Sequence, residues 1–154
     1  YASRIYADMR AIDLAAEAAD RAAERAPGDA DAWERVGRLR LQLFQREAAI
    51  AALDKARRLG PSLDGLLDLA TAYTLAGDVG GEVSATDQAT KQHGDSVEAW
   101  TRHTFALART DRTTEAIGAA ERALKLGAGE EVKELLARLK DTLPRVLPEA
   151  QPAV

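Results

Sequence analysis

Two histidines are the side chains of this sequence best suited to acid–base or metal chemistry. His93 lies in the segment KQHGD, where a predicted helix ends and a basic group interacts favourably with the helix dipole. His103 lies between Trp100 and Leu107 on a predicted core-facing position, and no second histidine is within a helical turn of it. We therefore interpret His103 as a packed structural residue rather than as a base or a metal ligand.

Acidic pairs and glycine-rich segments are the other patterns that could carry chemistry. Glu130 and Glu131 stand at the predicted start of a helix, where solvated acids are common. Residues 77–81 (GDVGG) follow a predicted helix rather than a strand, and the Lys-Ser/Thr of a phosphate-binding loop is missing. Neither a serine–histidine–aspartate order nor a metal-ligand spacing is present. The sequence therefore predicts a protein that is not an enzyme and that uses no metal and no cofactor.

The composition narrows the class of protein further. The 154 residues are 46% hydrophobic but only 5% aromatic, so alanine must supply much of the core, which suits closely packed helices. A net charge of −4, spread over interleaved acids and bases, argues against a nucleic-acid binder. No apolar run approaches the roughly 20 residues that span a membrane. The absence of cysteine favours the cytoplasm and leaves the periplasm as the alternative. Since the chain starts at Tyr1, we expect a fragment in which a signal peptide would not be visible.

One stretch, residues 33–61, carries small and large apolar residues in an order that specifies two packed helices. Small residues allow two antiparallel helices to approach, large ones fill the space beside the crossing, and proline ends the second helix. In order along the chain they are Trp33, Gly37, Ala49, Leu53, Ala56 and Pro61. This pattern resembles the tetratricopeptide repeat, a helix–turn–helix unit of about 34 residues.

The resemblance extends along most of the chain in steps of 33 or 34 residues. Trp33 matches Trp100, Tyr6 matches Tyr73, and Pro27 matches Pro61. We expect one repeat domain over residues 1–142 and a proline-rich tail over 143–154. Within the domain we expect a partial unit 1–28, complete units 29–62, 63–95 and 96–128, and a capping helix 129–142, because the last unit of a repeat stack would otherwise expose its core face.

The resemblance implies an all-α fold, a right-handed α-solenoid of antiparallel helix pairs with about eight helices. The expected helices cover residues 3–26, 30–43, 46–59, 63–76, 82–92, 96–109, 113–126 and 130–142. The first is expected to be unbroken, with no turn inside the partial unit.

Several local details are also predicted. Trp33 and Leu53 are expected to fill the space beside the helix crossing at Gly37 and Ala49. Residues 95–98 (DSVE) resemble a capping box that starts at Asp95. The helix at 82–92 is expected to start late and pack loosely, because Glu82 and Thr86 replace the crossing residues and Gly80 lowers helix propensity nearby.

In the tetratricopeptide family, the first helix of each unit lines a concave groove. By register, this implies a groove that shows the following residues: Glu34, Arg35, Arg38, Leu41, Gln42, Leu67, Asp68, Thr71, Thr74, Leu75, Thr101, Arg102, Phe105, Ala108 and Arg109. The predicted peptide-binding residues among them are Arg35, Arg38, Thr71, Thr74, Arg102, Phe105 and Arg109. Arginines hold carboxylates in two-point contacts, and Phe105, which has no assigned place in the core, is a candidate apolar anchor. A solvated helix face is the alternative interpretation.

The resemblance implies a non-catalytic scaffold or adaptor that binds a protein or peptide, acidic in character, in its groove. Some family members clamp a chaperone C-terminus with lysines, asparagines and an arginine. This chain has no asparagine, only Arg102 fits that pattern, and Arg38 is a partial substitute, so we do not expect binding of that kind. Two alternatives remain at this point. The first is self-association as a homo-oligomer through apolar surface left by the partial unit. The second is an accessory domain of a larger enzyme or regulator.

Overall fold

The structure is a computed structural model that describes residues 2–143, so the predicted proline-rich tail lies outside the described residues except for Leu143. Eight helices and no strand make up the described part. They are α1 (Ala2–Arg25), α2 (Ala30–Gln42), α3 (Arg46–Leu59), α4 (Leu63–Ala76), α5 (Val79–Gln92), α6 (Val97–Ala108), α7 (Thr113–Lys125) and α8 (Glu130–Thr142). The predicted all-α solenoid is confirmed.

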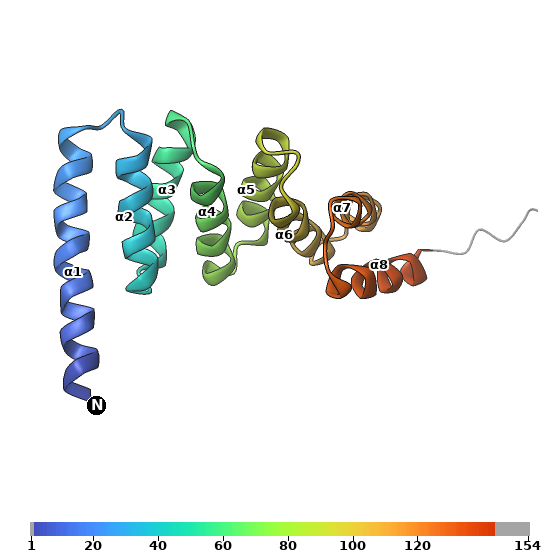
Figure 1. Cartoon of the computed structure of the whole chain (residues 1–154), viewed down its shortest axis with the longest axis horizontal. Coiled ribbons are helices and arrows are strands. Elements are labelled where there is room, and N and C mark those ends of the chain that lie inside the picture. The colour runs from blue at the N-terminus through green and yellow to red at the C-terminus, as the bar shows by residue number, and fades with distance from the viewer. Residues whose placement is uncertain (1, 144–154) are drawn as a thin grey trace, which may run out of the picture.

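Consecutive helices run side by side in alternating directions, and the pairs stack into an elongated array (Figure 1). Each helix packs mainly against its neighbours in sequence, with further contacts between α2 and α4 and between α6 and α8. We call α2, α4 and α6 the first helices, and α3, α5 and α7 the second helices, of three successive pairs. No helix within residues 2–143 is long and apolar enough to cross a membrane.

The first helices begin at side-chain caps that repeat along the chain. The carboxylate of Asp29 accepts hydrogen bonds from the amides of residues 31 and 32, and the hydroxyls of Ser62 and Ser96 accept from those of residues 65 and 99. These oxygens satisfy amides that have no partner within the helix. The cap predicted at Asp95 was therefore one residue too early, because Ser96 supplies the oxygen.

Of the two large residues predicted at the α2–α3 crossing, Leu53 fills the space beside Gly37 and Trp33 does not. A Cβ atom on Gly37 would overlap Cγ of Leu53, whose side chain is fully buried. Trp33 is only half-buried and its indole Nε1 donates to the Pro27 carbonyl at 3.1 Å. The predicted role of Trp33 at the crossing was wrong. The indole is better stabilised at the loop, because its ring packs on apolar groups there and its N–H has a hydrogen-bond acceptor.

Trp100 of α6 makes the same contact two helix pairs later. Its Nε1 donates to the Gly94 carbonyl at 3.0 Å, again six residues back along the chain. The two tryptophans therefore fasten the loops before α2 and α6 in the same way, in agreement with the sequence register.

Helix α5 differs from its prediction. It starts at Val79 rather than residue 82, because Asp78 caps it by accepting from the Gly81 amide at 2.8 Å. Gly81 lies directly against the Tyr73 ring, where a Cβ atom would overlap ring carbons. The helix is also well packed, since Val83, Thr86 and other residues of one face are buried. Glycine here permits close approach of α4 and α5, and this outweighs its low helix propensity.

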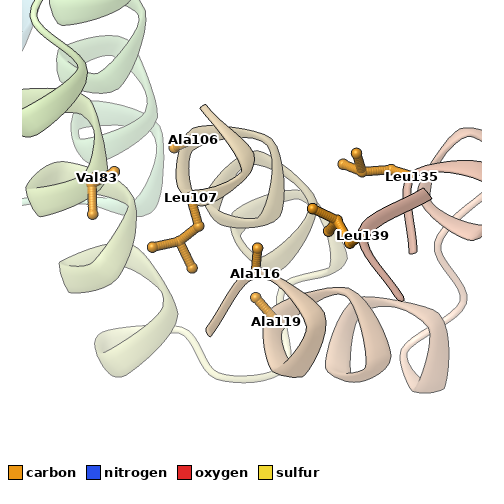
Figure 2. Packing of buried hydrophobic residues seen from close by; sticks show 7 residues of the cluster. All are labelled: Val83, Ala106, Leu107, Ala116, Ala119, Leu135 and Leu139. Atoms are coloured by element: carbon orange, nitrogen blue, oxygen red, sulfur yellow. The ribbon is translucent and has the colours of Figure 1, made fainter. Parts of the chain in front are cut away.

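The C-terminal helices share one apolar cluster. Leu107 of α6 lies between Val83 of α5 and two alanines of α7, Ala116 and Ala119 (Figure 2). Leu135 and Leu139 of α8 complete the cluster from the other side. Val132 is fully buried against α7. Helix α8 thus covers the apolar face that the last helix pair would otherwise expose.

Helix α1 is continuous, as predicted, and it extends well past the end of α2 (Figure 1). Only part of the apolar stripe of α1 is covered. Ala16, Ala19 and Ala23 are buried, whereas Ile5 and Met9 are about half exposed at 52% and 47%. Arg40 of α2 forms an ion pair with Asp20 and so fixes the upper part of α1 to the array.

Candidate functional site

A groove between α4 and α6 brings together most of the predicted binding residues. We call it the α4–α6 groove. It is lined by Thr71, Thr74, Leu75, Glu82, Arg102, Phe105 and Arg109, and its volume is about 290 Å³. Five of the seven predicted residues thus lie together.

Helical periodicity explains this arrangement. Thr71, Thr74 and Leu75 are spaced at i, i+3 and i+4 on α4, so they share one face. Arg102, Phe105 and Arg109 are spaced at i, i+3 and i+7, the first two on α6 and the third at its C-cap, so they share a face in the same way. Because the two first helices are neighbours in the array, the two faces form opposite walls.

Arg102 is held firmly in one wall of the groove. Its guanidinium donates to the Leu67 carbonyl at 3.0 Å and to the Thr71 hydroxyl at 2.7 Å, both on α4. On its own helix it lies 3.5 Å from the carboxylate of Glu98, which is 63% exposed. Arg102 therefore ties α6 to α4, and its orientation is fixed before any ligand arrives.

Arg109 neutralises a buried acid beneath the groove. It forms an ion pair with Glu82, whose side chain is only 9% exposed, while the arginine itself is 46% exposed. Removing one partner of such a pair would leave a poorly solvated charge. Glu82 was missed as a groove residue. Its signal in the sequence was an acid at a position that the repeat pattern reserves for a small buried residue.

Phe105 has a larger structural role than the sequence indicated. It lines the groove, but it is also half-buried and packs against the cluster of Leu107, Leu135 and Leu139. The interpretation of Phe105 as an aromatic residue with no place in the core was wrong. The same side chain packs against the cluster that holds α8 and lines the groove.

Arg35 and Arg38 do not line this groove. Arg38 forms an ion pair with Asp68 of α4 at 3.0 Å, and this pair is exposed. Arg35 lines a second groove between α1 and α2. Of the predicted binding residues, Arg35 and Arg38 therefore lie outside the α4–α6 groove.

Glu34 was also predicted to face the groove, but it is buried. Its carboxylate accepts hydrogen bonds from the Ser62 amide and hydroxyl, both at 2.7 Å, at the N-terminus of α4. Gly65 makes room for it, because a Cβ atom there would overlap the carboxylate. A carboxylate at a helix N-terminus is favourable, so Glu34 stabilises the junction of two units.

His103 lies in the core, as the sequence predicted. The residue is 7% exposed, and its Nδ1 is hydrogen-bonded to the Thr86 hydroxyl at 2.9 Å. Burial lowers the pKa of His103 below its usual value, and the positive charge of Arg112 adds to this effect, while Asp87 and Glu115 oppose it. Within residues 2–143, no group of three or more His, Asp or Glu residues could hold a metal ion.

Comparison with solved structures identifies the fold of the chain. No family model and no curated protein matches the chain. Solved structures of helical repeat proteins do match: YrrB, described as a TPR protein with an unusual peptide-binding site, has a TM-score of 0.74 at 16% identity, covering 90% of this chain and 72% of YrrB. MamA has a TM-score of 0.75 at 16% identity, covering 84% of this chain and 77% of MamA.

A third structure is the first TPR domain of Spaghetti (RPAP3) bound to the HSP90 peptide SRMEEVD. Its TM-score is 0.64 at 19% identity, covering 73% of this chain and 90% of that one. The described chain therefore has the tetratricopeptide-repeat fold, as the spacing of its small and apolar residues predicted.

Proposed function

We propose that this chain is a non-catalytic interaction module that binds a segment of another protein in the α4–α6 groove. The single observation that carries this proposal is the convergence of Thr71, Thr74, Arg102, Phe105 and Arg109 on one groove. Similar structures that bind peptides support it, since YrrB is described with a peptide-binding site and the RPAP3 domain holds a peptide.

The groove favours a ligand with one apolar and one acidic side chain. Leu75 is 43% exposed and faces the same space as Phe105, so an apolar side chain would gain by burial there. Arg102 and Arg109 offer guanidinium groups beside it. Because Glu82 and Glu98 already offset much of their charge, the groove suits a single carboxylate rather than a strongly acidic segment.

The carboxylate would bind through Arg102 in exchange for Glu98. That internal pair is long and exposed, and exposed pairs contribute little stability. Arg109 is less free to exchange, because it neutralises buried Glu82. The peptide of the RPAP3 structure is not the ligand that we propose for this chain. Asp68 and Glu98 place acidic groups where a carboxylate clamp needs basic or amide groups.

The test is selection of ligands from a displayed library of random peptides on the 154-residue chain. The peptides enriched are expected to share a carboxylate next to an apolar residue. Thr74→Glu should weaken their binding about tenfold or more, which corresponds to about 1.4 kcal/mol, because it sets a like charge at the rim. Leu75→Lys should weaken binding as well, by removing the apolar wall.

Two matched controls separate the groove from general surface effects. Thr114→Glu changes an exposed threonine on α7, and Leu59→Lys changes a leucine on α3 that is 45% exposed, close to the value for Leu75. Both controls should bind the selected peptides like the unchanged chain. Reversal of Arg102 or Arg109 is a poor test, since it breaks structural contacts. Peptides that bind Thr74→Glu and Leu75→Lys undiminished would refute the proposed site.

A further inference from the structure

A second pocket lies away from the α4–α6 groove, where the α1–α2 loop meets the C-terminal part of α3. These two segments lie at the same edge of the array (Figure 1). The pocket has a volume of about 280 Å³, and we call it the Trp33 pocket; it is lined by Pro27, Trp33, Lys55, Arg58 and Leu59. It shares no residue with the α4–α6 groove. Sites for drug-sized ligands are usually larger, about 300–1,000 Å³, so this pocket suits a single residue of a ligand.

One part of the Trp33 pocket is apolar and accessible. The Trp33 indole is half-buried, and its hydrogen bond to the Pro27 carbonyl at 3.1 Å fixes its position. Leu59 is 45% exposed, although it is a large aliphatic residue. An apolar side chain that packs against the ring and Leu59 would remove the apolar surface of all three groups from water, which is favourable.

The other part of the pocket carries positive charge. The Lys55 ammonium lies 4.0 Å from the centroid of the Trp33 ring, and it has no carboxylate partner within residues 2–143. Arg58 pairs with Asp54 at 2.7 Å, but the same carboxylate also lies 2.6 Å from the Arg57 guanidinium. Residues 54–58 therefore hold three cations and one carboxylate, a local charge of +2 in a chain whose total is −4. This end of α3 favours an anionic ligand.

The matching site in the third helix pair shows what is different at Trp33. Counting forward 67 residues leads from Trp33 to Trp100 and from Lys55 to Arg122. The Arg122 guanidinium donates to the Gly94 carbonyl at 3.2 Å, on the loop before α6. Lys55 has no hydrogen bond of this kind to any of the described residues, so its N–H groups are available to a ligand.

We propose that the Trp33 pocket binds the C-terminal residue of a partner protein, one that has an apolar side chain and a free carboxylate. The side chain packs against Trp33 and Leu59, and the carboxylate accepts hydrogen bonds from Lys55 and Arg58. An ammonium group has three donors, so Lys55 keeps its place over the ring and still donates. Arg58 is free to turn, because its side chain is 77% exposed and ion pairs of exposed side chains contribute little stability.

The short distance between charge and ring favours a terminal residue over an internal one. The Lys55 ammonium and the centroid of the Trp33 ring are only 4.0 Å apart. In a C-terminal residue, the carboxylate and the side chain branch from the same Cα atom, so both reach such a site together. In an extended internal segment, neighbouring side chains point to opposite faces, and those on one face are about 6.6 Å apart.

The two tryptophans provide an internal control for the test. Each indole N–H gives one signal in a nitrogen–proton correlation spectrum of the isotope-labelled chain, and Trp100→Phe identifies which is which. The probe is the N-acetylated peptide Gly-Ser-Gly-Ser-Leu with a free C-terminus. During titration the Trp33 signal is expected to shift while the Trp100 signal stays in place, because the cation beside Trp100 is already bound to its loop.

Two further comparisons test the contact with the carboxylate. The same peptide with a C-terminal amide should bind about tenfold more weakly or worse, because a hydrogen-bonded charge is lost. Lys55→Gln should have an effect of the same size; glutamine is the residue that α5 carries 33 positions later, at Gln88. Lys55→Arg should retain binding. Lys125→Gln, which changes an exposed base on α7, is the matched control and should bind like the unchanged chain.

Equal binding of the acid and amide peptides would overturn the proposal. So would equal shifts of the two indole signals, or a Trp33 signal that does not move at millimolar peptide. The amide comparison uses the unchanged chain, so it does not depend on how any variant folds. A peptide that enters the α4–α6 groove through an acidic side chain needs no free C-terminus, so these results leave the proposed function untouched.

Discussion

Helices α1 and α3 occupy equivalent places in the array but differ in what covers them. Ala49 and Ala56 of α3 are fully buried, and Leu53 between them closes the crossing with α2. Ala15 and Ala22 of α1, at the matching positions, face an open slot. The residue types are nearly the same, so the difference in burial comes from a missing neighbour and not from composition.

This difference shows what a repeat pattern specifies. Small residues indicate where another helix can pack closely, because only small side chains allow two helix backbones to approach each other. They do not ensure that the approaching helix belongs to the same chain. At α3 that helix is α2; at α1 the corresponding segment continues α1 itself. The same spacing of small residues can therefore lie in an internal core at one position and on an open surface at another.

The largest predicted effect comes from enlarging the equivalent alanines. Ala56→Leu should lower the free energy of unfolding by about 1–3 kcal/mol, because the added atoms have no space at the buried crossing. Ala22→Leu should leave the stability of the single chain within about 0.5 kcal/mol, because its side chain faces the slot. Urea denaturation of both variants in dilute solution measures the difference. Equal losses would mean that the two helices are covered alike.

Two glycines in helix interiors provide a second test of the difference between covered and open positions. Gly37 faces Leu53 with no room for a Cβ atom, whereas nothing lies within 4 Å of a Cβ atom on Gly118 of α7. Alanine improves helix propensity by about 1 kcal/mol at either site. Gly118→Ala should therefore raise the melting temperature, and Gly37→Ala should lower it, because overpacking exceeds the gain. A rise for both would show that the α2–α3 crossing is looser than the structure indicates.

The smallest predicted effect is a dependence of stability on pH through His103. Burial lowers its pKa in the folded chain, whereas the unfolded chain has the ordinary value of about 6.5. The unfolded state therefore binds the proton more readily, and stability falls as the pH is lowered through about 6.5 until the folded pKa is passed. His103→Gln should flatten this decline, and His93→Gln, outside the core, should retain it. Identical pH profiles for all three chains would exclude this role.

Much of the fold could be predicted from the sequence because its signals are local or strictly periodic. Proline, glycine and capping residues mark helix ends, and the spacing of alanines fixes which faces meet. Trp33 was misplaced because its large ring suits either a crossing or a loop, and only the position of the Pro27 carbonyl decides between them. The start of α5 was misjudged because the gain from close packing of Gly81 on Tyr73 is not visible in helix propensity.

The candidate site was harder to predict because it depends on distant partners. The repeat register places Glu34 in the groove, but its carboxylate accepts hydrogen bonds from Ser62, 28 positions later. Glu82 replaces a small crossing residue in the repeat pattern, and its charge is neutralised by Arg109, 27 positions later. The partners in such pairs are too far apart in the sequence to form a short motif. Periodicity therefore predicts which helix face a polar side chain lies on, but not which residue it contacts.

The central claim of this account is that the chain binds a peptide segment in the α4–α6 groove. The most direct measurement is a titration of the isotope-labelled chain with a peptide selected on it, followed residue by residue through amide chemical shifts. The account predicts the largest shifts around Thr71, Thr74, Leu75, Arg102 and Phe105, with little change in α3 and α7. Shifts concentrated on α3 and α7, or on the groove between α1 and α2, would contradict it.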